Sequence, residues 1–251
     1  MIEVRGVHAH IGDHEVCRDL SFVLPAGKSL AILGRNGAGK STLLATLAGL
    51  RKAKRGEVLL AGRSLGDYAL RDLARLRGYC AQQQHDAFET SVLETALAGR
   101  HPHLDRWSWE GAADEAIAVA ALDRVGLAGF AGRTVQTLSG GERQRLAIAT
   151  LLAQQPALYL IDEPLNHLDL NHAMATLALL RDETAQGRTL VAVLHEPNFA
   201  RRYFDYALQL FGDGSWQFGE AAALGADSLQ RLYGHPLRTL QDNGEPWFIP
   251  E

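Results

Sequence analysis

The chain has 251 residues, 47% of them hydrophobic, which is enough for a buried core in one α/β domain. Its formal net charge is −4 and its longest basic run is the short turn 51–55, which argues against nucleic-acid binding through bulk electrostatics. The two cysteines lack C-x-x-C spacing, and no uncharged apolar stretch reaches the roughly 18 residues of a membrane span, so we expect a reducing compartment, no disulfide and no span in this sequence.

The first third of the sequence alternates short apolar runs with turns around one helix. Strands are predicted at 2–5, 29–33 and 57–60, and a helix with apolar spacing close to 3.6 begins near Ser41. Between the second strand and the helix, residues 34–41 read G-R-N-G-A-G-K-S and fit the phosphate-loop pattern G-x-x-x-x-G-K-[ST]. The strand, the loop and the helix occur in the order that this pattern requires.

This loop has the chemistry of a polyphosphate site. Its glycines let backbone N–H groups point at phosphate oxygens, and the N-terminus of the following helix favours negative charge. Lys40 would contact the β and γ phosphates of ATP, and Ser41 would hold Mg²⁺. The candidate nucleotide-binding residues of this segment are Gly34, Arg35, Asn36, Gly37, Ala38, Gly39, Lys40, Ser41 and Thr42.

A helical region interrupts the predicted sheet. Residues 84–155 are rich in alanine, with the clearest amphipathic stretch at 110–127 and a further helical run at 142–153. The sheet resumes with the apolar run 158–161, which leads directly into two acidic residues. Open α/β sheets bind their ligands at such carboxyl-terminal strand edges.

The two acidic residues suit the chemistry of phosphoryl transfer. Asp162 is a candidate Mg²⁺ ligand, and Glu163 is a candidate for orienting or deprotonating the water that attacks the γ-phosphate. Paired with the phosphate loop, adjacent carboxylates at a strand end indicate an active site rather than a solvated turn.

The last third of the sequence continues the alternation of helices and strands. A helix is predicted at 170–186, and a strand at 189–194 leads into His195. A further strand is predicted at 206–211, and a terminal hairpin at 237–249 turns at Asn243 and Gly244. The other nine histidines lack ligand spacing and are expected at the surface.

Residues 138–145, L-S-G-G-E-R-Q-R, resemble the signature of ATP-binding cassette (ABC) proteins, and a Q-loop at 78–82 and a D-loop at 166–169 follow the order of that family. The resemblance spans nearly the whole chain and implies an ATPase of the α/β phosphate-loop NTPase fold. Its mixed or parallel sheet core would carry an inserted helical subdomain. The resemblance further implies that Gln82 joins the Mg²⁺ and water shell, Asp169 touches the opposite active site and His195 contacts the γ-phosphate.

The chain has one phosphate loop and one signature, and in this family the signature of one copy covers the nucleotide of the other. The resemblance therefore implies a homodimer, in which the N–H groups of Ser139, Gly140 and Gly141 face a γ-phosphate across the interface. We expect a single domain over residues 1–251. Its parts are a nucleotide-binding core at 1–83 and 156–221, a helical subdomain at 84–155 and a hairpin extension at 222–251.

Three short stretches, 82–84, 99–103 and 168–172, are similar to ATPase subunits that power import of iron-siderophore, haem and cobalamin complexes. That likeness implies integral membrane permease subunits as partners and, indirectly, a substrate-binding protein. It also implies a peripheral location on the cytoplasmic face of the inner membrane. We expect the permease to dock on the surface after Gln82 and on the helical segment 88–103, through apolar Phe88, Val92 and Leu93. The sequence leaves the particular chelate open.

One departure from the family concerns the base of the nucleotide. An aromatic residue that stacks on adenine usually follows the first strand, and here Ile11 takes that place, with His10 as the alternative ring. The preference for ATP over GTP is therefore open.

Two alternatives to a transporter subunit remain. A soluble ABC ATPase of the iron–sulfur assembly type shares these motifs and is similar in length. A purely structural cassette that does not hydrolyse ATP is the other, and the presence of Lys40, Asp162, Glu163 and His195 together argues against it.

Overall fold

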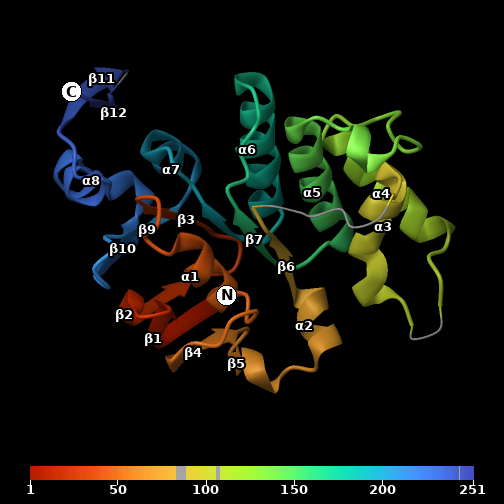
Figure 1. Ribbon diagram of the computed structural model, residues 1–251, viewed down its shortest axis with the longest axis horizontal. Coiled ribbons are helices and arrows are strands. Elements are labelled where there is room, and N and C mark those ends of the chain that lie inside the picture. Colours follow the sequence, from red (N-terminus) through yellow and green to blue (C-terminus); the bar gives the residue numbers. More distant parts are fainter. Residues whose placement is uncertain (83–88, 106–107, 243) are drawn as a thin grey trace. The chain divides into compact units, whose positions relative to one another are not determined.

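The computed structural model describes residues 1–82, 89–105, 108–242 and 244–251 (Figure 1). They form two compact units. The first unit combines Met1–Asp67 with Thr189–Glu251, and the second is Tyr68–Arg188. Residues 83–88, 106–107 and 243 lie outside the described part of the chain. The predictions made for Gln83, Gln84, Phe88 and Asn243 therefore fall on residues that are not described.

A largely parallel sheet forms the core of the first unit. β3 (Ser29–Gly34) runs parallel to β8 (Thr189–Val193) on one side and to β9 (Tyr206–Leu210) on the other, and β10 (Trp216–Glu220) pairs antiparallel with β9. Every residue of β3 and β8 is buried. Strands that are covered on both faces have continuous apolar sequences. The strands predicted at 29–33, 189–194 and 206–211 from such sequences are confirmed.

A second sheet of the first unit is antiparallel, in the order β2-β1-β4-β5. Its strands are β1 (Ile2–Ile11), β2 (His14–Leu24), β4 (Arg55–Leu60) and β5 (Arg63–Ser64). The sequence indicated only residues 2–5 of β1 and missed β2. Irregularities in the pairing of β1 with β2 shift the register between Val4 and His10, and they break the alternation that identifies a strand.

Helices and a hairpin complete the first unit. They are α1 (Lys40–Leu47), α7 (Pro197–Tyr203), α8 (Ala226–Tyr233) and the short 3₁₀ turns η1 (Leu65–Asp67) and η4 (Ala221–Ala223). β11 (Leu237–Asp242) and β12 (Glu245–Pro250) pair antiparallel, as the sequence predicted for a hairpin at 237–249. α8 and the hairpin form the end of the chain in Figure 1.

The second unit consists of two parallel strands and a group of helices. β6 (Arg77–Cys80) pairs with β7 (Leu158–Asp162), whose five residues are all buried. The helices are α2 (Leu70–Leu76), α3 (Val92–Leu97), η2 (Ala98–His103), α4 (Ala112–Arg124), η3 (Val135–Thr137), α5 (Gly140–Gln154) and α6 (Leu170–Ala185). α3, α4 and α5 pack against one another (Figure 1). Within the described ranges, no helix combines the length and apolar character that a bilayer span requires.

The packing of α3 corrects one expectation about the surface. Val92 is fully buried at the start of α3, and Leu93 is only partly exposed. The prediction that Val92 belongs to a docking surface is therefore wrong, because this residue faces the core of the helical unit. A charged substitution at Val92 would therefore affect folding, and it would not test docking to a permease.

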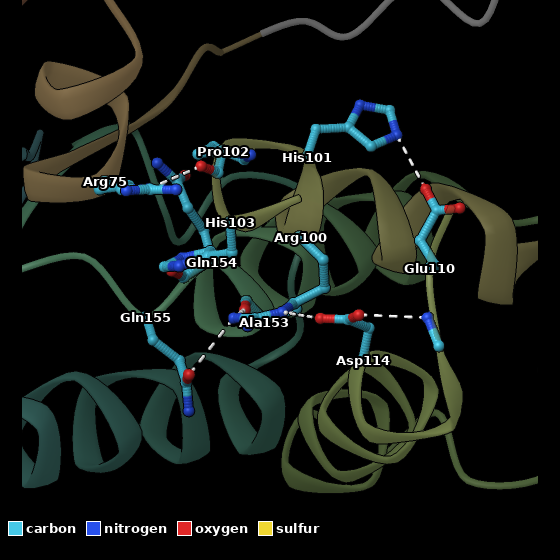
Figure 2. A network of polar contacts seen from close by, with 11 residues as sticks. Arg75, Arg100, His101, Pro102, His103, Glu110, Asp114, Ala153, Gln154 and Gln155 are labelled. Atoms are coloured by element: carbon cyan, nitrogen blue, oxygen red, sulfur yellow. Dashed lines mark hydrogen bonds and ion pairs between the residues drawn. The ribbon is translucent and has the colours of Figure 1, made fainter. Parts of the chain in front are cut away.

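Arg100, from the stretch 99–103, joins three elements of the second unit (Figure 2). Its Nε donates to Asp114 Oδ1 at 2.9 Å, and a terminal nitrogen donates to the carbonyl of Ala153 at 2.8 Å. This carbonyl belongs to the last turn of α5, where no partner exists within the helix. The hydrogen bond from Arg100 also lowers the pKa of the Asp114 carboxyl group.

The same stretch is bonded to α2 and to the end of α5. His103 Nε2 donates to the Gln154 carbonyl at 2.8 Å, and Arg75 Nε donates to the Pro102 carbonyl at 2.7 Å (Figure 2). Gln154 Nε2 in turn donates to the carbonyls of Ala74 and Arg77. Residues 99–103, one of the three stretches similar to importer subunits, thus bond several helices of the second unit to one another. His103 is half-buried here rather than fully exposed.

Gly99 is required by this packing. A Cβ at this position would overlap the carbonyl oxygen of Thr150 on α5. We expect Gly99→Ala to lower the free energy of unfolding by about 1–3 kcal/mol. The melting temperature should fall by about 2–4 °C for each kcal/mol, measured by circular dichroism. Gly132→Ala is the matched control, because Gly132 is exposed and its added Cβ would meet nothing within 4 Å. Equal melting temperatures for the two variants would contradict this explanation.

Candidate functional site

The phosphate loop connects β3 to α1 in the first unit. Gly37 and Gly39 have φ values of 82° and 87°, a region that favours glycine. A Cβ on Gly39 would overlap Val16, and a Cβ on Gly34 would lie 2.9 Å from the Leu210 carbonyl oxygen. The glycines of the motif are therefore fixed by backbone conformation and by close packing.

Lys40 is buried inside this loop. Its Nζ donates to the carbonyls of Gly34 at 3.0 Å and Arg35 at 3.1 Å. The amides of Gly37, Gly39 and Ser41 donate no hydrogen bond to any described residue. Amides at a helix N-terminus that lack partners in the protein bind anions well. The loop thus presents an ammonium group and several N–H donors to a polyphosphate.

The other predicted residues of this segment differ in exposure. Gly34, Ala38 and Gly39 are buried, Thr42 is half-buried, and the exposed members are Arg35, Asn36, Gly37 and Ser41.

His195 lies at the same edge of the sheet as the phosphate loop. Ile32 of β3 is in register with Val193 of β8, and the Leu194 amide donates to the Ile32 carbonyl at 3.0 Å. His195 follows directly and is exposed. Because β3 and β8 are parallel, their carboxyl ends meet at one edge, where α/β sheets bind ligands.

A polar cluster surrounds Glu163 at the end of β7 in the second unit. Glu163 has a φ of 53° and is buried, as is the neighbouring Asp162. Gln82 Nε2 donates to Glu163 Oε2 at 2.7 Å, and Asn166 Nδ2 donates to the same oxygen. Two amide side chains therefore orient this carboxylate. Asn166 was named from the sequence only as the first residue of the D-loop, and its contact with Glu163 was not predicted. Its position three residues after Glu163 is a local cue for that contact.

The signature forms the N-terminus of α5. Ser139 Oγ accepts from the Glu142 amide at 3.3 Å, and Glu142 Oε2 accepts from the Ser139 amide at 2.7 Å. This capping box lowers the pKa of Glu142, first through the bond from the Ser139 backbone. Gly140 and Gly141 begin the helix, and a Cβ on Gly141 would lie 2.8 Å from the carbonyl oxygen of His167.

The signature and the D-loop line one pocket of about 430 Å³ within the second unit. Asp169 caps α6 by accepting from the His172 amide at 2.9 Å, and this bond is the main cause of its lowered pKa. The pocket combines the N-terminus of α5 with Arg145 and two imidazole groups, beside the carboxylates of Glu142 and Asp169; the helix N-terminus is the part of it that suits an anion. Its lining residues are Ser139, Gly140, Gly141, Glu142, Arg145, His167, Leu168, Asp169 and His172.

Ile11 stands at the end of β1, and its side chain is 42% exposed. His10 beside it is half-buried, with Nε2 3.8 Å from Glu15 Oε1. An aliphatic side chain offers less stacking area to a purine than an aromatic ring does.

We therefore expect GTP to compete with ATP within about tenfold, or about 1.4 kcal/mol, in displacement of a fluorescent ATP analogue. Ile11→Tyr is the matched variant and should raise the preference for ATP. A preference of several hundredfold in the unaltered chain would contradict the prediction.

Comparison of the sequence with known proteins assigns the chain to a family. Residues 17–166 match the ABC transporter family. The hemin import ATP-binding protein HmuV of Deinococcus radiodurans is 41% identical over 246 residues, covering 96% of this chain and 92% of the relative. The ferric enterobactin transport ATP-binding protein FepC of Escherichia coli is 37% identical, covering 95% and 90%.

Solved structures of ABC proteins are also similar to this chain. An ABC transporter assigned to the metal-chelate type, in an inward-facing conformation, has a TM-score of 0.85 and 30% identity, over 100% of this chain and 97% of that chain. A dimeric ATP-binding cassette bound to ADP and phosphate has a TM-score of 0.77 and 26% identity, over 89% and 100%. The chain belongs to the ABC transporter family, as an ATP-binding and ATP-hydrolysing cassette subunit with the α/β phosphate-loop NTPase fold.

Proposed function

We propose that this chain is the ATPase subunit of a membrane importer for a metal chelate, such as an iron-siderophore, haem or cobalamin complex. One observation carries the proposal: relatives named for hemin and ferric enterobactin transport align with nearly the whole chain. The likeness to a metal-chelate type transporter supports it. The alternative of an iron–sulfur assembly ATPase is not favoured, because these relatives are import proteins.

The first unit would bind the phosphates of ATP. Residues 34–42 would wrap the β and γ phosphates through backbone amides and the Lys40 ammonium group, and His195 would contact the γ-phosphate. Fixed donors of this kind stabilise the charge that develops during phosphoryl transfer. The role of His195 is supported by its place at the carboxyl edge of β8.

The second unit would supply the residue that acts on the attacking water, together with two of the metal ligands. Glu163, oriented by Gln82 and Asn166, positions or deprotonates the water. Its proposed Mg²⁺ ligands, Gln82 and Asp162, offer amide and carboxylate oxygens, and the ligand proposed in the first unit, Ser41, offers a hydroxyl; these are the hard donors that Mg²⁺ prefers. When bound, Mg²⁺ would neutralise charge on the phosphate oxygens.

Two copies of the chain would share two active sites. Ser139, Gly140, Gly141 and Asp169 line a pocket suited to an anion, and we assign to this pocket the γ-phosphate of ATP held by a second copy. ATP binding would then favour the dimer and hydrolysis would release it, because ADP lacks the shared phosphate. The dimeric cassette with ADP and phosphate supports this proposal.

We further propose that the ATPase dimer binds integral membrane permease subunits at the cytoplasmic face of the inner membrane and acts together with a substrate-binding protein, with no nucleic-acid partner. Residues 84–155 would form the subdomain that meets the permease, residues 1–83 and 156–221 the nucleotide-binding core, and 222–251 an extension.

Co-purification of the tagged full-length chain tests this function. An integral membrane protein should come with it from detergent-solubilised membranes, and cells carrying Lys40→Ala should lose uptake of haem, ferric siderophore or cobalamin. Recovery only from the soluble fraction, together with iron–sulfur assembly proteins and with normal uptake in Lys40→Ala cells, would reject the importer.

A further inference from the structure

The C-terminal part of the first unit contacts the segment that carries His195. The Oη of Tyr233, the last residue of α8, donates to the His195 carbonyl at 3.1 Å. α8 is held in place by Leu229 and Leu232, both fully buried. The carbonyl of the histidine is thus hydrogen-bonded to a packed helix, through a tyrosine 38 positions later in the chain.

A second contact lies three residues further along. The side chain of Asn198, in α7, makes two hydrogen bonds with the backbone of Phe248 in β12. Its Nδ2 donates to the Phe248 carbonyl at 3.0 Å, and its Oδ1 accepts from the Phe248 amide at 2.9 Å. The Phe248 side chain is buried. Segment 195–198 is therefore fixed at both ends by residues of the C-terminal extension.

The same end of α8 also lies near the side chain of Arg35, a residue of the phosphate loop. Gly234 ends α8 in the left-handed conformation, with a φ of 68°. A Cβ on Gly234 would lie 3.3 Å from a guanidinium nitrogen of Arg35. One helix terminus is therefore close to the side chain of Arg35 and is hydrogen-bonded to the histidine segment.

Burial favours the donor role of Tyr233. Its pKa is raised by burial and then by the charge of Glu196, so the phenol keeps its proton at neutral pH. A neutral phenol donates one hydrogen bond, and the His195 carbonyl accepts it.

We propose that the C-terminal extension, residues 222–251, positions His195, with Tyr233 as a positioning residue that acts on ATP hydrolysis through this histidine. This inference rests on the proposed contact of His195 with the γ-phosphate. Fixing the backbone at residue 195 reduces the freedom of the imidazole before ATP arrives, and a preorganised donor costs less to align in the transition state. Residues 222–251 would then serve catalysis as well as stability.

Tyr233→Phe tests this role, because it removes the hydroxyl and keeps the ring. The kcat for ATP should fall by about 3–10-fold, the range of one hydrogen bond, while the KM for ATP changes by less than about twofold. Asn198→Leu, which removes the contact to Phe248, should act in the same direction. The matched control is Tyr159→Phe, which removes a buried hydroxyl bonded to Glu183 Oε2 at 2.8 Å and should keep the wild-type kcat.

A double-mutant cycle separates positioning from general stability. In a His195→Ala background, Tyr233→Phe should cause no further loss of kcat, because the residue that it positions is gone. A wild-type kcat for Tyr233→Phe, or an equal fold loss in both backgrounds, would overturn the proposal. A wild-type kcat for His195→Ala alone would instead reject the role assigned to His195 in the proposed function.

Discussion

Glu163→Gln is expected to lower the rate of ATP hydrolysis by about 10²–10⁴-fold and to leave ATP binding intact. The amide has nearly the same shape as the carboxylate but cannot accept a proton from the attacking water. The phosphate loop, which is in the other unit, is untouched by this change. Phosphate release and binding of a fluorescent ATP analogue measure the two effects separately.

Glu220→Gln is the control for this experiment, because Glu220 is exposed at the end of β10. Its hydrolysis rate should equal that of the unaltered chain. Hydrolysis by Glu163→Gln within about threefold of that rate would reject the role of Glu163, since general-base assistance is typically worth at least about a hundredfold.

Ser139→Arg is expected to abolish the ATP-dependent dimer. The arginine side chain would extend from the N-terminus of α5 into the pocket of about 430 Å³ that the signature and D-loop line, and would occupy the place of a phosphate group at the helix N-terminus. The experiment uses the Glu163→Gln background, in which ATP is retained. Sedimentation velocity with and without ATP measures the loss.

Ser91→Arg provides a matched control. Ser91 caps α3 through the same reciprocal bonds with Glu94 that Ser139 makes with Glu142, so both substitutions remove a capping box. Ser91 does not line the signature pocket, and Ser91→Arg should still dimerise with ATP. An ATP-dependent dimer of Ser139→Arg as stable as that of the control would refute the shared site.

The core of the fold could be predicted because its parallel strands are covered on both faces. β3, β7 and β8 have no exposed residues, and such strands read as uninterrupted apolar runs between turns. Helix starts were predicted to within two residues where a cap marks them, as at α5 and α6. Local patterns were sufficient for these elements.

Contacts between distant residues could not be predicted in this way. The burial of Val92 depends on how α3 packs against α4 and α5, and no pattern within α3 reveals it. Tyr233 reaches a carbonyl in another element, and a lone tyrosine near a chain end carries no local cue. The phosphate-loop pattern, by contrast, was recognised from its spacing and from the strand and helix predicted on either side of it.

The bond between Arg100 and the end of α5 has a mechanical consequence. α5 has 15 residues, so it is a rod about 22 Å long, with the signature at one end and the Arg100 contact at the other. An α-helix resists bending over this distance. A displacement of residues 98–103 would therefore tilt the whole rod and move Gly140 and Gly141 at its far end. Arg100 connects residues 98–103, a segment that does not bind nucleotide, to the C-terminal end of α5. Movement of this segment would thereby reach the amides that begin the signature helix.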